Sequence, residues 1–360
     1  MRNARRPPPP APGAAGMTLV ELLVAFMVFS LLITALVSLT NISLDGWARG
    51  EQRKDIYDRA LLLLDSITDD LRNAHSENEV FIVGQRELQV PAFACDFDSN
   101  KQQRLRFVRT GTSRMGRAAR VADDAGLVNP AVYYADLWEV AYAMDPDPEK
   151  NILWRGIRGF DRETGPTLLR TTGYDRQIPV TFRPVEKGVL YVGFRFWTQY
   201  TTTWEERFGI QQVGPGSRKG SGPEVRWDST RQREKAFYFH KKEYDRSNPD
   251  FVYPEIVQIT IVLESTVSLV EGMRLAEDLN PTAVTARLNG TQGLPDAPNM
   301  VKIGAEWIEY GGMTLNELTN LKRGQRGTVK QAHALNASVR FGEAFTTDVR
   351  IPAYREAQEP

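Results

Sequence analysis

The first strong pattern along the chain is a run of apolar residues near its N-terminus. From Met17 to Leu44 the only charged residue is Glu21, and this span of 28 residues exceeds the roughly 20 that cross a bilayer as an α-helix. We therefore predict a transmembrane helix over residues 17–44. The preceding residues 1–16 contain three arginines and several prolines, which disfavour a helix there. By the positive-inside rule, the N-terminus is expected in the cytoplasm, with the rest of the chain in the periplasm.

The pattern stays helical beyond the apolar run, up to about residue 75. Apolar residues recur there every three or four positions, which is the period of one α-helical face. The acidic residues of the segment, including Asp70, are expected mostly on the opposite face. Gly46 and Gly50 favour a bend or local unwinding. We predict that residues 45–75 form the periplasmic half of one long helix, packed on a head through its apolar stripe. That stripe consists of Ile56, Ala60, Leu64, Ile67, Leu71 and Ala74.

Downstream, the hydrophobic period changes from 3.6 residues to two, which is typical of β-strands. Two of the segments have turn residues in the middle and are predicted as hairpins. One long helix followed by many antiparallel strands predicts an α+β fold. The strand segments are 79–93 and 136–160 (the hairpins), 104–110, 188–206, 254–264 and 343–352.

Composition narrows the functional classes. The chain has 360 residues, of which 41% are hydrophobic and 25% charged, as in a folded globular protein. The formal net charge is zero, so no general attraction for nucleic acid is expected. The single cysteine, Cys95, excludes an intramolecular disulfide and a multi-cysteine metal site. We predict that it is a partly buried, inert thiol.

Glu21 is the unusual residue of the apolar run, because a carboxylate that faces lipid alone is energetically unfavourable. An ordinary secretory signal has its small-residue cleavage site after the apolar region. Here the small residues of "GAAG" come before it. A cut between Gly16 and Met17 would create an ammonium group at the depth of Glu21, and the two could pair.

The stretch "G-MTLVELLVAFMVFSLL" resembles the class III leader of type IV pilins and of type II secretion pseudopilins. Met17 differs from the phenylalanine usual at that position in the family. The resemblance implies cleavage by prepilin peptidase between Gly16 and Met17, and N-methylation of Met17. It also implies an assembly ion pair between Glu21 and the terminal amine of a neighbouring subunit.

The order of segments in the body resembles the J-type minor pseudopilin. That resemblance implies a pilin-like fold in the inner membrane. It also implies assembly with other minor pseudopilins and the major pseudopilin at a pseudopilus tip, in support of protein export. One alternative is a minor type IV pilin or a competence pseudopilin for adhesion or DNA uptake. Another is a membrane-anchored surface enzyme or binding protein that acts through residues 265–343. The aromatic residues Phe194, Phe196, Trp197 and Trp204 are interpreted as core.

Residues 265–343 do not fit this body and are predicted to be an inserted β-rich module. The expected organisation is a leader (1–16), a transmembrane helix (17–44), its periplasmic continuation (45–75), a head (76–264 plus 344–356) and the insertion. The insertion resembles a small β module of phage-tail and related surface proteins, and its glycines are expected at turns with positive φ. The matching residues are Ile303, Glu306, Trp307, Ile308, Tyr310, Arg323, Gly324, Gly327, Thr328, His333 and Val339.

Candidate chemistry elsewhere is sparse, and we predict a non-enzymatic chain without cofactors. The three histidines, His75, His240 and His333, are far apart in sequence and lack cysteines nearby, so no zinc signature is present. His333 is interpreted as structural. Asp96, Asp98 and Asn100 have the opening spacing of a calcium loop. Lys101 and Phe107 occupy its key later positions, so a polar turn is favoured and calcium binding is left open. Residues 214–237, rich in Gly, Lys and Arg, are predicted to form a mobile solvated loop.

Overall fold

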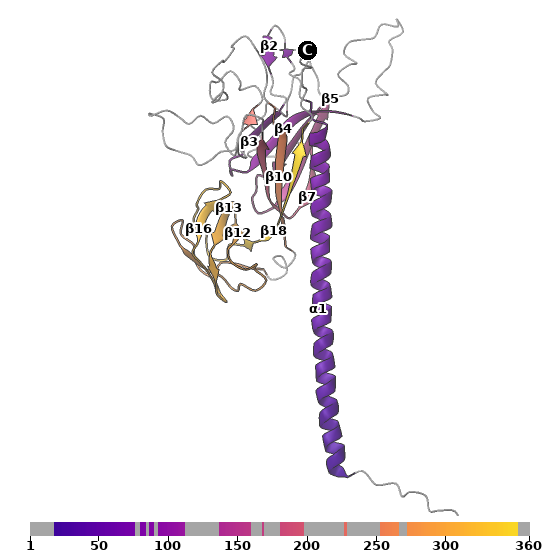
Figure 1. The fold of residues 1–360 in the computed structure, drawn as a ribbon. Helices are drawn as coiled ribbons and strands as arrows, with labels where there is room; N and C mark the ends of the chain where they lie inside the picture. Colours follow the sequence, from indigo (N-terminus) through magenta and orange to yellow (C-terminus); the bar gives the residue numbers. More distant parts are fainter. Residues whose placement is uncertain are drawn as a thin grey trace, which may run out of the picture. The chain divides into compact units, whose positions relative to one another are not determined.

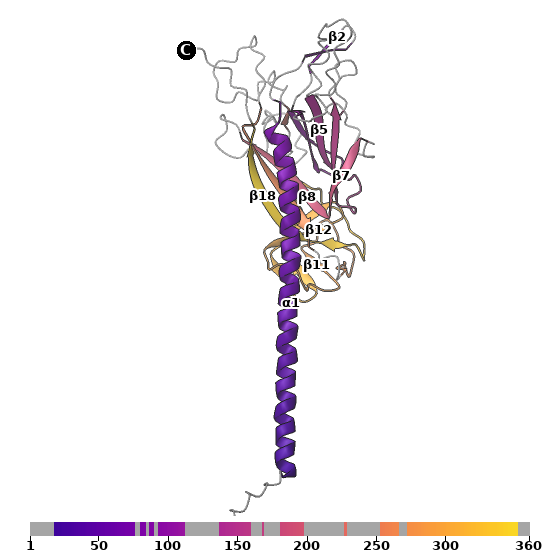
Figure 2. The same ribbon diagram turned by 90° about the vertical axis from the view of Figure 1, so that its right-hand side faces the viewer.

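The computed structural model describes residues 18–75, 80–83, 86–89, 93–111, 137–159, 168, 181–197, 227–228, 253–265 and 272–351. The chain forms two compact units, residues 1–55 and 56–360. One long helix precedes a series of strands (Figures 1 and 2), and every strand pairing between described residues is antiparallel. The predicted α+β class is therefore confirmed.

Helix α1 runs from Leu19 to Arg72 (indigo in Figure 1). It contains a stretch with a mean hydropathy of 2.7, long and apolar enough to cross a membrane. The helix is not interrupted at Gly46 or Gly50, so the local unwinding expected there does not occur. An isolated glycine costs a helix about 1 kcal/mol relative to alanine, which is too little to break a helix of this length.

The larger sheet has six strands in the order β7-β6-β5-β4-β3-β9. The predicted hairpin of residues 136–160 is confirmed as β5 and β6, and that of residues 79–93 as β1 and β2. Three strands of this sheet were not predicted, and one of them is β3, of which the predicted segment 79–93 reaches only the first residue. The other two are β7 and β9, and β9 lies inside the segment that was expected to be a solvated loop. The strands of this sheet are β3 Phe93–Phe97, β4 Gln103–Thr110, β5 Leu137–Met144, β6 Ile152–Gly159, β7 Phe182–Lys187 and β9 Trp227–Asp228. Strands β1 (Val80–Val83) and β2 (Arg86–Gln89) form a separate two-stranded sheet.

A second sheet of three strands has the order β18-β10-β8. Its outer strands, β8 (Val189–Trp197) and β18 (Gly342–Arg350), are labelled in Figure 2, and β10 (Ile256–Glu264) pairs with both. A side-chain amide joins this sheet to the six-stranded one. Gln103 Nε2 of β4 donates to the carbonyl of Phe194 in β8 at 3.2 Å, and the Phe194 amide donates back to Gln103 Oε1. The Gln103 side chain thus forms hydrogen bonds with both main-chain groups of Phe194, as a neighbouring strand would.

The main core of the head lies between the C-terminal part of α1 and these two sheets. The predicted stripe on α1 is buried except for Leu64, which is half-buried, and Leu63 is buried in addition. Phe194 and Phe196 are buried as predicted. Trp197 is half-buried, and Trp204 lies outside the described residues.

Residues 272–341 form two further sheets around a core of their own. One sheet has the order β16-β13-β12-β17 and the other the order β11-β15-β14. Gly324 and Gly327 have φ angles of +67° and +76°, as expected for the turns of the motif. The bounds are β11 Thr285–Arg287, β12 Asn299–Ile303, β13 Glu306–Tyr310, β14 Gly312–Met313, β15 Glu317–Thr319, β16 Lys322–Gln325 and β17 Val339–Arg340.

Candidate assembly site

The start of α1 is held by reciprocal hydrogen bonds between Thr18 and Glu21. The Thr18 amide and hydroxyl donate to Glu21 Oε2 at 2.9 and 3.0 Å, and the Glu21 amide donates to Thr18 Oγ1 at 3.3 Å. This arrangement is a capping box, which satisfies amide groups that the first helical turn leaves unpaired. Gly16 and Met17 lie outside the described residues. The sequence signal for the capping box, Thr-x-x-Glu before an apolar run, was present but not recognised.

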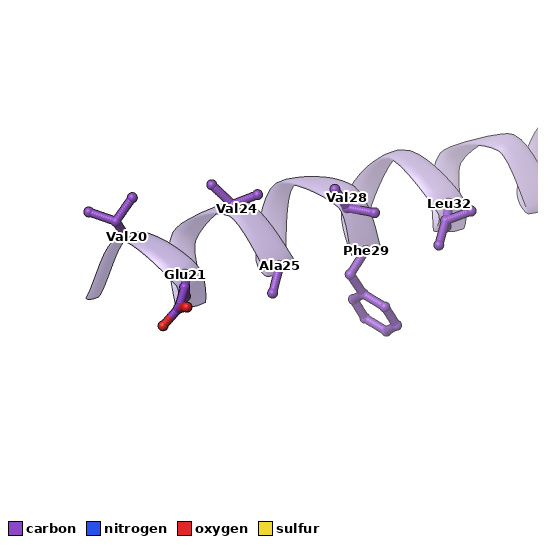
Figure 3. Close-up of a pocket in the computed structure, with 7 residues that line it drawn as sticks. All are labelled: Val20, Glu21, Val24, Ala25, Val28, Phe29 and Leu32. Carbon is purple, nitrogen blue, oxygen red and sulfur yellow. The ribbon is translucent and has the colours of Figure 1, made fainter. Parts of the chain in front are cut away.

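Glu21 lies at the N-terminal end of an apolar helix face. Its carboxylate points to the same side as Ala25 and Phe29, one and two turns further along (Figure 3). All side chains from Thr18 to Leu44 are exposed in the single chain. A continuous apolar surface of this size is normally covered by lipid or by other helices. The residues lining this face are Val20, Glu21, Val24, Ala25, Val28, Phe29 and Leu32.

Asp70 anchors the other end of α1 in the head, contrary to its predicted position on the solvent face. Its side chain is 2% exposed and accepts hydrogen bonds from Arg155 at 2.7 and 2.8 Å. Arg109 Nη1 and the Tyr142 hydroxyl donate to the same carboxylate. Burial, and then the neighbouring Asp70 charge, raise the pKa of Tyr142. A buried carboxylate is tolerated here because several donors surround it.

Of the three residues considered for calcium, Asp96 lies in β3, and Asp98 and Asn100 lie in the turn that follows it. Asp96 binds the guanidinium groups of Arg104 and Arg106 at 2.8 and 2.6 Å. Asp98 Oδ1 accepts the amides of Asn100 and Gln102 at 2.9 and 2.8 Å. Both carboxylates therefore have protein donors. Within the described part of the chain, no group of three or more His, Cys, Asp or Glu side chains is placed to hold a metal ion.

Cys95 and His333 are both buried. Cys95 is 1% exposed, and burial raises the pKa of its thiol well above the ordinary value. His75 and His333 belong to different parts of the fold, and His240 lies outside the described residues. His333 is buried and its Nε2 lies 2.8 Å from Glu306 Oε2.

Several residues of the β-module motif converge on the buried Glu306 carboxylate. Arg323 donates to both of its oxygens at 2.8 and 2.7 Å, and the Gly324 and Gln331 amides each donate at 3.0 Å. Burial alone would raise the pKa of Glu306. The hydrogen bonds from His333, Arg323 and Gln331 outweigh it and lower the pKa to about 2. The motif thus encodes a structural ion cluster.

The long apolar helix and the antiparallel sheets define an α+β chain with a pilin-like arrangement. No family model and no curated protein matches the chain. Among solved structures, the chain is similar to the GspK-GspI-GspJ complex of the type 2 secretion system from enterotoxigenic Escherichia coli. That match has 12% sequence identity and a TM-score of 0.25, and covers 57% of this chain and 87% of the other. At these values, the match carries no functional conclusion.

Proposed function

We propose that the chain is a non-enzymatic, pilin-like subunit that is anchored in the inner membrane and assembles through its N-terminal helix. The observation that carries this proposal is a membrane-length apolar helix with a single carboxylate at its start, directly after a Gly16-Met17 pair. The proposed system is type II secretion, with the chain as a J-type minor pseudopilin at the pseudopilus tip. The proposed partners are other minor pseudopilins, the major pseudopilin and prepilin peptidase.

The proposed mechanism depends on when a cation becomes available to Glu21. Cleavage between Gly16 and Met17 frees an amine two residues before Leu19, the first residue of α1, and N-methylation keeps that amine basic. In an assembly, the exposed apolar faces of neighbouring helices pack together. Glu21 then pairs with the terminal amine of a neighbour, which offsets the unfavourable transfer of its carboxylate into lipid. The cytoplasmic N-terminus and periplasmic head follow from the arginines before the helix.

Mass spectrometry of the chain purified from membranes tests the processing step. We expect an N-terminus at Met17 that carries a methyl group. An N-terminus at Met1, or a cut elsewhere in the first 44 residues, would contradict the leader interpretation.

Substitution of Glu21 tests the assembly step separately. We expect Glu21→Ala to be cleaved as the wild type is but to lose most of its cross-linking to partner subunits. Glu51→Ala is the matched control, because Glu51 is an exposed glutamate of the same helix. Normal cross-linking of Glu21→Ala would refute the ion pair. Co-purification with pilus or competence subunits, rather than secretion subunits, would favour the alternative pilin function.

A further inference from the structure

The chain leaves and re-enters the three-stranded sheet at one point. Glu264, the last residue of β10, is paired with Gly342, the first residue of β18. The ladder continues one step further, because the Ser265 amide donates to the Phe341 carbonyl at 3.0 Å. A Cβ at position 342 would lie only 1.9 Å from the Leu263 carbonyl oxygen, so the re-entry point requires glycine. β10 and β18 therefore have the geometry of a hairpin whose turn is replaced by residues 266–340.

The inserted residues bury a core that is separate from the core of the head. Alternation along β12 and β13 gives one sheet two different faces. Val301 and Ile308, paired across the two strands, point into the insertion's own core. Lys302 and Trp307, also paired across the strands, contact the head instead.

The head meets this outer face with matching chemistry. Trp307 packs on Leu190 and Val262. Arg326 lies over the Tyr191 ring of the head at 4.3 Å and over the Trp307 ring at 4.6 Å, a favourable cation–π geometry.

Two cations of the insertion complete the junction. The Lys302 ammonium donates to the Pro148 carbonyl at 3.0 Å and to Asn151 Oδ1, both in the turn between β5 and β6. Arg340 pairs with Glu264 at 3.0 Å and with Glu149 at 3.6 Å. The junction thus combines an apolar patch with positive charges on the insertion and acceptors on the head.

We infer that the head carries a built docking surface for an inserted module of the same chain, and that residues 266–340 can be removed without loss of the head's fold. The docking surface consists of the β5–β6 turn, Leu190, Tyr191, Val262 and Glu264. It fixes the module's orientation on the head. Subunit assembly, if it proceeds as proposed above, does not require the module.

The first test removes the module from the full chain. Replacing residues 266–340 with Asn-Gly joins Ser265 to Phe341 through a two-residue turn, the length that a paired antiparallel hairpin accepts. The shortened chain also carries Leu190→Thr and Val262→Thr, because the deletion removes Trp307 and exposes these two apolar side chains to solvent. We expect a cooperative unfolding transition of the detergent-solubilised chain and protected amides in β10 and β18. A chain without a cooperative transition would count against separability.

The second test keeps the whole chain and weakens only the junction. In Trp307→Ala/Arg326→Ala, we expect amide exchange to rise at least tenfold in residues 148–151 and at Val189, whose amide donates to the Asn151 carbonyl at 2.9 Å. Exchange in β10, β18 and the module core should stay within twofold of the wild type. Lys322→Ala is the control, because Lys322 pairs with Glu309 inside the module. If the double variant lost amide protection throughout both the module core and the head, the inference would be wrong.

Cross-linking of the shortened chain separates this inference from the proposed function. If the wild type cross-links to partner subunits and the shortened, folded chain does so equally, both ideas are supported. If the wild type cross-links to partner subunits but the folded, shortened chain does not, the module is needed for assembly and that part of the inference is wrong. If neither chain cross-links, the proposed function fails, while separability is still decided by the unfolding and exchange measurements.

Discussion

Replacing Asp70 by asparagine should strongly destabilise the attachment of α1 to the head. The change removes one negative charge but keeps the size of the side chain. Two guanidinium groups, from Arg109 and Arg155, would then lie against a neutral amide, together with the Tyr142 hydroxyl. Because the acceptor is buried, water cannot replace it at the same position.

The magnitude follows from how deeply each partner is buried. Removing one member of a buried ion pair typically costs about 3–5 kcal/mol. The Asp70 side chain is 2% exposed, but the side chains of Arg109 and Arg155 are 13% and 26% exposed, so both retain some access to water. We therefore expect a loss at the lower end, about 3 kcal/mol in the free energy of unfolding.

Urea unfolding of the full chain in detergent, followed by tryptophan fluorescence, would measure this loss. The matched control is Asp69→Asn. The Asp69 side chain is 70% exposed and lies 3.8 Å from Arg109, a geometry worth less than about 1 kcal/mol. Equal unfolding midpoints for Asp70→Asn and Asp69→Asn would refute the proposed anchoring role of Asp70.

Three further predictions concern buried polar groups of the head and the insertion. Burial lowers the pKa of Lys302 from 10.5 to about 8. Between pH 8 and 10.5 the folded state therefore binds fewer protons than the unfolded state, and the free energy of unfolding of the wild type should rise with pH. The free energy of unfolding should rise by up to about 3 kcal/mol. Lys302→Met should abolish this rise in urea titrations at several pH values, and an unchanged pH dependence in the variant would show that Lys302 is not its source. The lowered pKa of Glu306 contributes stability above pH 4.5 that is lost as the pH falls towards 2. Glu306→Gln should remove that acid dependence and cost about 3 kcal/mol at pH 7, whereas Glu309→Gln, with a more exposed partner, should change little. Gln103→Leu should cost about 1–3 kcal/mol in thermal or urea unfolding, because it leaves the Phe194 main chain unpaired; a neutral effect would argue against the link between the sheets.

Much of the head was predictable because its signals are local. The β5–β6 hairpin combines two alternating strands with an Asp-Pro-Asp-Pro turn, and each part can be recognised within 25 residues of sequence. Strand β7 was missed because Pro184 and the charged residues of "FRPVEK" conceal the alternation. It forms at the edge of the sheet, where proline is tolerated.

The candidate assembly site was predictable in part, for a related reason. The apolar run and its single carboxylate are properties of consecutive residues, and they indicate a membrane helix without any knowledge of the fold. The capping role of Thr18 was encoded equally locally, in a Thr-x-x-Glu pattern, but was overlooked.

The sequence by itself determined the long helix, most of its buried stripe and the antiparallel strands, because hydrophobic period and turn residues act over a few neighbouring positions. Only the tertiary structure decided which polar residues are buried. Asp70 borders the apolar stripe, and its burial depends on arginines 39 and 85 positions away in sequence. Lys302 is buried only because the insertion packs on a turn about 150 residues earlier. Such partners are brought together by the packing of whole sheets, and no local pattern records them.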